Sequence, residues 1–143
     1  MRNVDISLTR ISIYHWRRLL RNPSLAMKLL AWNCQGLGSP WTVHALDELL
    51  RFHNPALVFL SETKCKKRKC ENLKEKYNLF GINVDSCGKK GGLILLWRKD
   101  INLVVNSFSC SHIDVGVFNE ERVAGWRFTS IYGQPDVGRR GET

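Results

Sequence analysis

The stretch from Met27 to Trp41, MKLLAWNCQGLGSPW, decides the fold that this sequence predicts. Its apolar run KLLAW is bounded by turn residues and is typical of a short buried strand. Ser39 suits the cap of a following helix. Pro40 suits the first helical position, because proline lacks the amide that this position leaves unpaired. The stretch therefore predicts a strand, a glycine-containing turn and a helix in succession.

The segments after this stretch continue the pattern. Val43, Leu46, Leu49 and Leu50 recur at helical spacing, and the sequence HNP at 53–55 ends the helix. A second buried strand is predicted at 56–63, a charged stretch that tolerates a helix at 64–77 and a turn at 88–92. Four further strands are predicted at 93–98, 101–108, 113–118 and 126–133. The order βαβα followed by consecutive strands favours an α/β layered fold with a mixed or antiparallel sheet.

Residues 1–26 differ from the rest of the chain in composition, with five arginines and a single acidic residue, Asp5. Part of this segment, ISIYHWRRLL at 11–20, can form a basic amphipathic helix. Three interpretations stay open: a disordered leader, a helical leader or an organelle transit peptide. We predict that this leader is separate from a folded domain that spans residues 27–143.

The chain has 143 residues, a formal net charge of +9 and five cysteines. This length predicts one domain, and no apolar run is long enough to span a bilayer, so we expect no membrane association. The charge favours anionic partners such as nucleic acid, although basic solvated surfaces are common without that role. The cysteines lack a paired metal-binding spacing, which favours reduced thiols in an intracellular protein.

Two chemical interpretations of the opening stretch can be compared. Gly36 and Gly38 match the first two positions of a dinucleotide-binding loop, but Trp41 stands where that loop needs a third small residue. We therefore expect no organic cofactor. In the second interpretation, Asn33 and Glu62 end two neighbouring strands and form one site, with a carboxylate for Mg²⁺ and an amide that orients a phosphate. The alternative is that Asn33 caps a turn and Glu62 caps the following helix.

Four motifs, WNCQGLG, LSETK, GGLILLW and IYGQP, occur in this order and resemble the endonuclease/exonuclease/phosphatase superfamily. The resemblance is closest to the endonuclease domain of LINE-type (non-LTR) retrotransposons, especially those of plants, and it covers residues 27–143. It implies the N-terminal portion of a DNase I-like two-sheet α/β sandwich. It also implies cleavage of a DNA phosphodiester that depends on Mg²⁺, with Mn²⁺ able to substitute.

The resemblance also implies roles for individual residues. Asn33 matches an asparagine that positions the phosphate and the nucleophile, and Glu62 matches the metal-binding glutamate. Tyr132 matches a tyrosine whose hydroxyl contacts the scissile phosphate. Gln134 departs from the histidine often found in that motif, at a position that is not catalytic. The basic run after Glu62 either contacts the DNA backbone or forms a solvated helix face, and its members are Lys64, Lys66, Lys67, Arg68 and Lys69.

The sequence holds neither a GDFN-type motif nor an SDH-type motif, which in the family supply phosphate ligands and the general base. His112 and Asp114 lie in a predicted strand and do not replace them. His44 and His53 lie on or beside the first helix and match no catalytic position.

We therefore expect a truncated nuclease domain with little or no activity. The alternatives are a nucleic-acid-binding remnant without catalysis and a phosphatase of the same superfamily. The expected location is nuclear or cytoplasmic, or an organelle if the leader is a transit peptide. The sequence predicts no particular oligomeric state.

Overall fold

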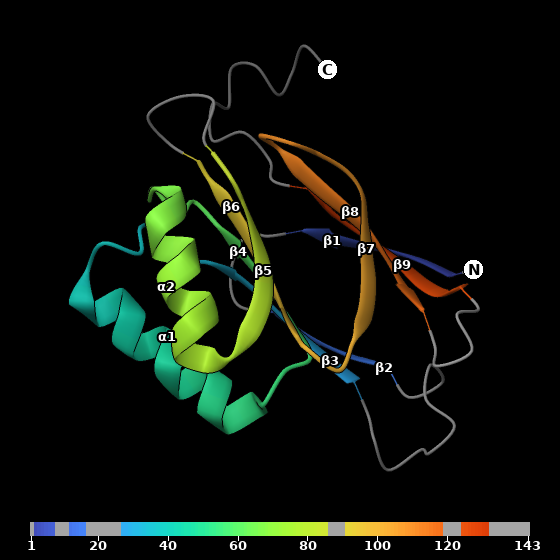
Figure 1. The fold of residues 1–143 in the computed structure, drawn as a ribbon, viewed down its shortest axis with the longest axis horizontal. Helices are drawn as coiled ribbons and strands as arrows, with labels where there is room; N and C mark the ends of the chain where they lie inside the picture. Colours follow the sequence, from blue (N-terminus) through green and yellow to red (C-terminus); the bar gives the residue numbers. More distant parts are fainter. Residues whose placement is uncertain (1, 8–11, 17–26, 86–90, 119–123, 132–143) are drawn as a thin grey trace.

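The computed structural model describes residues 2–7, 12–16, 27–85, 91–118 and 124–131. In this part of the chain, two helices, a five-stranded sheet and a four-stranded sheet form three successive layers (Figure 1). The predicted mixed α/β architecture is therefore confirmed, and it contains two sheets.

The five-stranded sheet has the order β2-β3-β4-β6-β5. Neighbours β3 and β4 run parallel, while the other neighbouring strands of this sheet run antiparallel. The strands are β2 (Ser12–Trp16), β3 (Met27–Asn33), β4 (Leu57–Ser61), β5 (Leu79–Val84) and β6 (Leu93–Arg98). A parallel pair needs a crossover connection, and the first helix provides it between β3 and β4.

The four-stranded sheet has the order β1-β9-β8-β7. Strands β7, β8 and β9 form an antiparallel meander, whereas β1 pairs with β9 in parallel. The strands are β1 (Arg2–Ser7), β7 (Asn102–Ser109), β8 (His112–Phe118) and β9 (Ala124–Ile131). The β7–β8 register shifts between Val105 and Ser107, so a bulge interrupts this ladder.

The two helices are α1 (Pro40–His53) and α2 (Lys67–Tyr77). Ser39 occupies the predicted cap position of α1, but its side chain makes no capping hydrogen bond. Asn54 and Asn78 end the two helices in the left-handed conformation, which asparagine adopts more readily than most residues.

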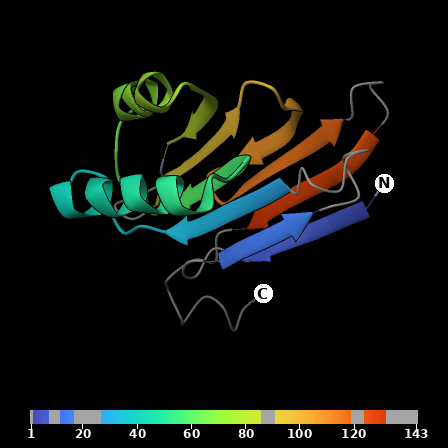
Figure 2. The same cartoon turned by 90° about the horizontal axis from the view of Figure 1, so that it is seen from below.

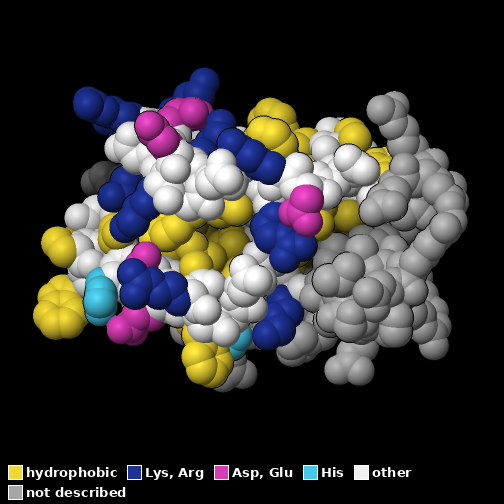
Figure 3. Space-filling view, turned by 60° about the horizontal axis from the view of Figure 1, so that its bottom comes forward, with side chains coloured by type: hydrophobic (Ala, Val, Ile, Leu, Met, Phe, Trp, Pro, Cys, Tyr) yellow, Lys and Arg dark blue, Asp and Glu magenta, His cyan; other side chains and the backbone are white. Residues whose placement is uncertain are grey.

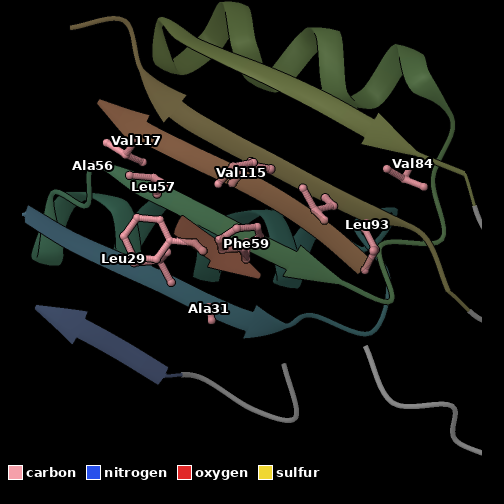
Figure 4. Close-up of a cluster of buried hydrophobic side chains, with 12 residues drawn as sticks. Leu29, Ala31, Ala56, Leu57, Phe59, Val84, Leu93, Val115 and Val117 are labelled. Atoms are coloured by element: carbon pink, nitrogen blue, oxygen red, sulfur yellow. The ribbon is translucent and has the colours of Figure 1, made fainter. Parts of the chain in front are cut away.

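Alternation along β3 and β4 divides the core into two clusters, because successive strand side chains point to opposite faces. Leu29, Ala31 and Phe59 lie between the two sheets and pack with residues of β8 such as Val115 (Figure 4). Residues of opposite parity, among them Leu30 and Val58, pack under the helices with Leu46 of α1 and Leu73 of α2. Both faces of β4 are buried, as its continuous apolar run predicts.

The N-terminal segment differs from the prediction. Residues 12–16, predicted as part of an amphipathic helix in one interpretation, form β2 and pair antiparallel with β3. Residues 2–7 form β1 and pair with β9. Figure 2 shows both strands along the same side of the molecule. The helical interpretation is therefore wrong at 12–16, and these two strands extend the sheets of the domain.

Three smaller findings complete the fold. Strand β5 was not predicted, because its mixed polarity and its glycine give no clear alternation. Cys110 is disulfide-bonded, contrary to the expectation that the thiols are reduced, whereas Cys34, Cys65 and Cys70 are free. Among the described residues, no helix is both long enough and apolar enough to cross a bilayer.

Candidate functional site

The pairing of β3 with β4 brings Asn33 and Glu62 to the same end of two neighbouring strands in the five-stranded sheet. Asn33 ends β3 and is in register with Ser61, which ends β4, and Glu62 follows directly. Because the two strands are parallel, their carboxyl ends meet at one edge, where ligands bind in many α/β sheets. The prediction that these two strands are neighbours is confirmed.

The side chain of Asn33 lies on the inter-sheet face of β3, since it shares the alternation of Leu29 and Ala31. Its oxygen Oδ1 is buried and accepts no hydrogen bond from the residues that the structure describes. Leaving a buried polar atom unpaired costs about 1–3 kcal/mol. An unsatisfied amide oxygen at a sheet edge is therefore a candidate contact for a ligand, a metal-bound water or a cation.

Glu62 is buried, with 9% of its surface exposed. Its backbone is left-handed, with φ of 51°, and this conformation is uncommon for residues other than glycine. The turn at Glu62 ends β4 and moves the following residues out of the strand direction. A strained backbone held at a strand end fits a residue whose side chain must be placed at a particular point.

Two glycines of the turn before β6 hold the backbone next to Glu62. The amide of Thr63 donates to the carbonyl of Gly92 (3.2 Å), and the amide of Lys64 donates to the carbonyl of Gly91 (3.0 Å). Gly92 has φ of 92°, and a Cβ there would lie 2.5 Å from Thr63 Oγ1. The sequence predicts only a turn at this segment. The two adjacent glycines are the sequence feature that indicates a close approach of two backbone segments.

The loop after β3 is hydrogen-bonded to the end of β4. The amide of Cys34 donates to the carbonyl of Ser61 (3.0 Å), and the amide of Leu37 donates to the carbonyl of Thr63 (2.9 Å). Gly36 has φ of 108°, which supports the predicted tight turn. Gly38 also lies in this turn, but it has no positive φ and a Cβ there would meet nothing within 4 Å, so this position does not require glycine.

Cys34 lies between the ends of β3 and β4 and is not an activated nucleophile. Its Sγ donates to the carbonyl of Ser61 at 3.3 Å. Burial raises the pKa of this thiol to about 12. The thiol therefore stays protonated at neutral pH, and only a thiolate would be reactive.

The basic run lies at the start of α2. Lys64, Lys66, Lys67 and Arg68 are exposed, so they are accessible to an anionic partner. Lys69 is half-buried and lines a cavity of about 430 Å³ between the two helices, together with Lys76 and His44. Figure 3 shows lysine and arginine side chains on several parts of one face, with acidic side chains among them. On this face the basic side chains are thus dispersed.

His112, His44 and Asp114 have structural partners. His112 on β8 contacts the hydroxyls of Ser109 (2.6 Å) and Ser107 (3.2 Å) through its two ring nitrogens. Asp114 on the same strand pairs with Arg127, whose guanidinium lowers the pKa of this carboxyl. His44 lies on α1, 3.2 Å from Glu48, and His53 ends that helix. That none of these residues has a catalytic role stays a prediction.

The residues at the carboxyl ends of β3 and β4 fit a hard cation only in part. In the ranges that the structure describes, no three His, Cys, Asp or Glu side chains gather where they could hold a metal. Mg²⁺ often takes one or two carboxylates and completes its shell with water and phosphate oxygens. Glu62, with the unsatisfied Oδ1 of Asn33 on the neighbouring strand, fits that arrangement. The predicted third residue, Tyr132, lies outside the described residues.

Comparison with known proteins yields neither a matching family model nor a matching curated protein.

Proposed function

We propose that this chain belongs to the endonuclease/exonuclease/phosphatase superfamily, as the N-terminal portion of a DNase I-like sandwich similar to that of LINE-type retrotransposons. The proposal is supported by a two-sheet α/β architecture and by the parallel strands β3 and β4 ending at Asn33 and Glu62. The single observation that carries it is the buried Asn33 Oδ1, which has no hydrogen bond from the described residues and lies on the strand beside Glu62.

In the proposed site, each residue performs one task on a DNA phosphodiester. Glu62 would hold Mg²⁺, which relieves charge on the phosphoryl oxygens and lowers the pKa of a bound water. The amide of Asn33 would orient the phosphate or that water without adding negative charge. Tyr132, by resemblance, would donate a hydrogen bond to the scissile phosphate. The exposed Lys64, Lys66, Lys67 and Arg68 would contact backbone phosphates.

No residue assigned to this site is a general base. General-base assistance contributes roughly 10²–10⁴ in rate, so hydrolysis by this set of residues alone should be slow. We therefore propose that the 143-residue chain has very low nuclease activity by itself.

A plasmid-nicking assay with Mg²⁺ tests this proposal. The purified chain is compared with Glu62→Ala, with an EDTA control and with Glu75→Ala, which removes an exposed carboxylate on α2. We expect slow nicking that is lost in Glu62→Ala and in EDTA but kept in Glu75→Ala. Nicking that survives Glu62→Ala would contradict the assigned role of Glu62.

The second candidate is nucleic-acid binding without catalysis, which the exposed basic run favours. Fluorescence anisotropy with a labelled DNA duplex, measured on the same samples at increasing salt, distinguishes the two. Salt-sensitive binding without nicking, equal in wild type and Glu62→Ala, would support the binding function alone. Release of phosphate from inositol phosphates, with no nicking, would instead indicate a phosphatase.

A further inference from the structure

Strand β7 ends the four-stranded sheet and has the features of an unprotected edge. It runs from Asn102 to Ser109 with the sequence NLVVNSFS, which contains no charged residue and no proline. In the part of the chain that the structure describes, β7 pairs with β8 on one side only. Val104 is 51% exposed and Phe108 is 62% exposed. Monomeric proteins usually protect such an edge with lysine, proline or a short strand.

A cavity of about 490 Å³ lies beside the first half of β7. Its lining combines β5 and β6 of one sheet with β7 and β8 of the other, including Phe80, Trp97, Leu103 and Phe118. The rings of Phe80 and Trp97 are 6.2 Å apart. Phe80 is 45% exposed at this opening. The space between the sheets is therefore open to an apolar side chain at this edge.

We propose that β7 is a self-association edge, which pairs antiparallel with β7 of a second copy of this chain. Antiparallel pairing of identical strands has two-fold symmetry and joins the two four-stranded sheets into one. The unpaired backbone groups along β7 would then be satisfied by the same groups of the other copy.

The distribution of side chains along β7 favours a second copy over an unrelated peptide. Phe108 projects at one end of the strand, and the aromatic cavity lies at the other end beside Leu103. In the β7–β8 register, Leu103 pairs with Val117 and Phe108 pairs with Ile113. Both of these β8 residues belong to the buried cluster between the sheets. A two-fold axis near the bulge places Phe108 of each copy next to the cavity of the other. The strand thus carries both halves of a self-complementary contact.

Charge also restricts where two copies can meet. Each chain carries +9, so most approaches are opposed by like charge. Strand β7 carries no charge, and Lys99 is the one cation among the described residues of β7 and of the cavity lining, so this contact brings few cations together. Added salt screens the remaining repulsion and should strengthen the dimer, whereas it weakens binding to DNA.

Light scattering coupled to size-exclusion chromatography, over a range of protein concentrations and at two salt concentrations, tests the proposal. The variants are Val104→Lys, which places a charge in the middle of the edge, and Phe108→Ala, which removes the projecting ring. Ile131→Lys is the matched control, since Ile131 is also 51% exposed but lies on β9, which has a strand on both sides. Circular dichroism establishes that each variant is folded.

We expect the wild type and Ile131→Lys to form dimers that strengthen with salt. Val104→Lys and Phe108→Ala should weaken dimerisation at least about tenfold. Hydrogen exchange should slow within residues 102–109 as wild-type concentration rises. A wild type that stays monomeric throughout, or a dimer that Val104→Lys leaves intact, would overturn the proposal. A concentration-dependent protection confined to another segment would overturn it as well.

Discussion

At the scale of single residues, Gly92 illustrates how a distant glycine can fix the backbone of a candidate site residue. It combines a positive φ with a contact at Thr63 that a Cβ would bring to 2.5 Å. Gly92→Ala should lower the free energy of unfolding by more than about 1 kcal/mol, because both the strain and the clash oppose the native turn. Urea denaturation measures this. Gly38→Ala is the control, since nothing lies within 4 Å there, and an equal loss in both variants would contradict the explanation.

Asp114 provides a pH-dependent contribution to stability. Its carboxylate is buried and accepts hydrogen bonds from Arg127 at 2.6 Å and from Thr129 at 3.1 Å. The Arg127 guanidinium lowers the pKa of this carboxyl, so the stabilisation is present above the unfolded pKa near 4 and is lost as the pH falls through the lower folded value. Asp114→Asn should cost about 1–3 kcal/mol at pH 7. Chemical denaturation at pH 7 and near pH 2 should show the difference from wild type shrinking with acidity, and a constant difference would contradict the assignment.

The sequence was informative about Asn33 and Glu62 because strand ends can be read from apolar runs and turn residues. Parallel pairing then follows from the helix between the two strands. The clamp at Gly92 could not be predicted, because it depends on two segments about thirty residues apart meeting in space. The unsatisfied Oδ1 of Asn33 is likewise a property of packing, which no local pattern encodes.

At the scale of elements, the N-terminal strands are where the structure and the sequence prediction differ most. Composition alone favours a leader for this segment, since arginine-rich and acid-poor stretches are typical of targeting peptides. Strands β1 and β2 instead occupy one edge of each sheet. Edge strands carry a weak local signal, because their stability depends on partners that are remote in sequence.

Removing residues 1–26 should therefore destabilise the domain and promote aggregation. The backbones of β3 and β9 would become exposed edges. A variant with proline at both Asn3 and Val4 and at both Ile13 and Tyr14 breaks the same pairings while it keeps the length and charge of the chain. Amides of consecutive strand residues point to opposite sides, so one of each pair must face the neighbouring strand. Thermal unfolding followed by light scattering should show both proteins unfolding below the wild type. Unfolding at the wild-type temperature would mean that the two strands contribute little.

At the scale of the whole molecule, the sequence predicted an α/β fold but not how its strands divide between two sheets. The strand after β6 continues the chain into the other sheet through a short turn, where the amide of Ile101 donates to the carbonyl of Arg98. A hairpin within one sheet would produce a similar pattern of strands and turns. Which sheet a strand joins depends on which of its faces is buried, and the same alternation of apolar and polar residues fits either sheet.

The pairing of β1 with β9 also has a consequence for how the protein is made. Arg2 lies opposite Trp126, so β1 leaves the ribosome long before its partner strand β9 has been made. The parallel β3–β4 unit, with its local crossover, can form much earlier during translation. The growing chain must therefore keep an unpaired N-terminal strand in solution while the five-stranded sheet assembles. Slowed translation would prolong this vulnerable interval, in which a chaperone that shields extended backbone would raise the yield of folded protein.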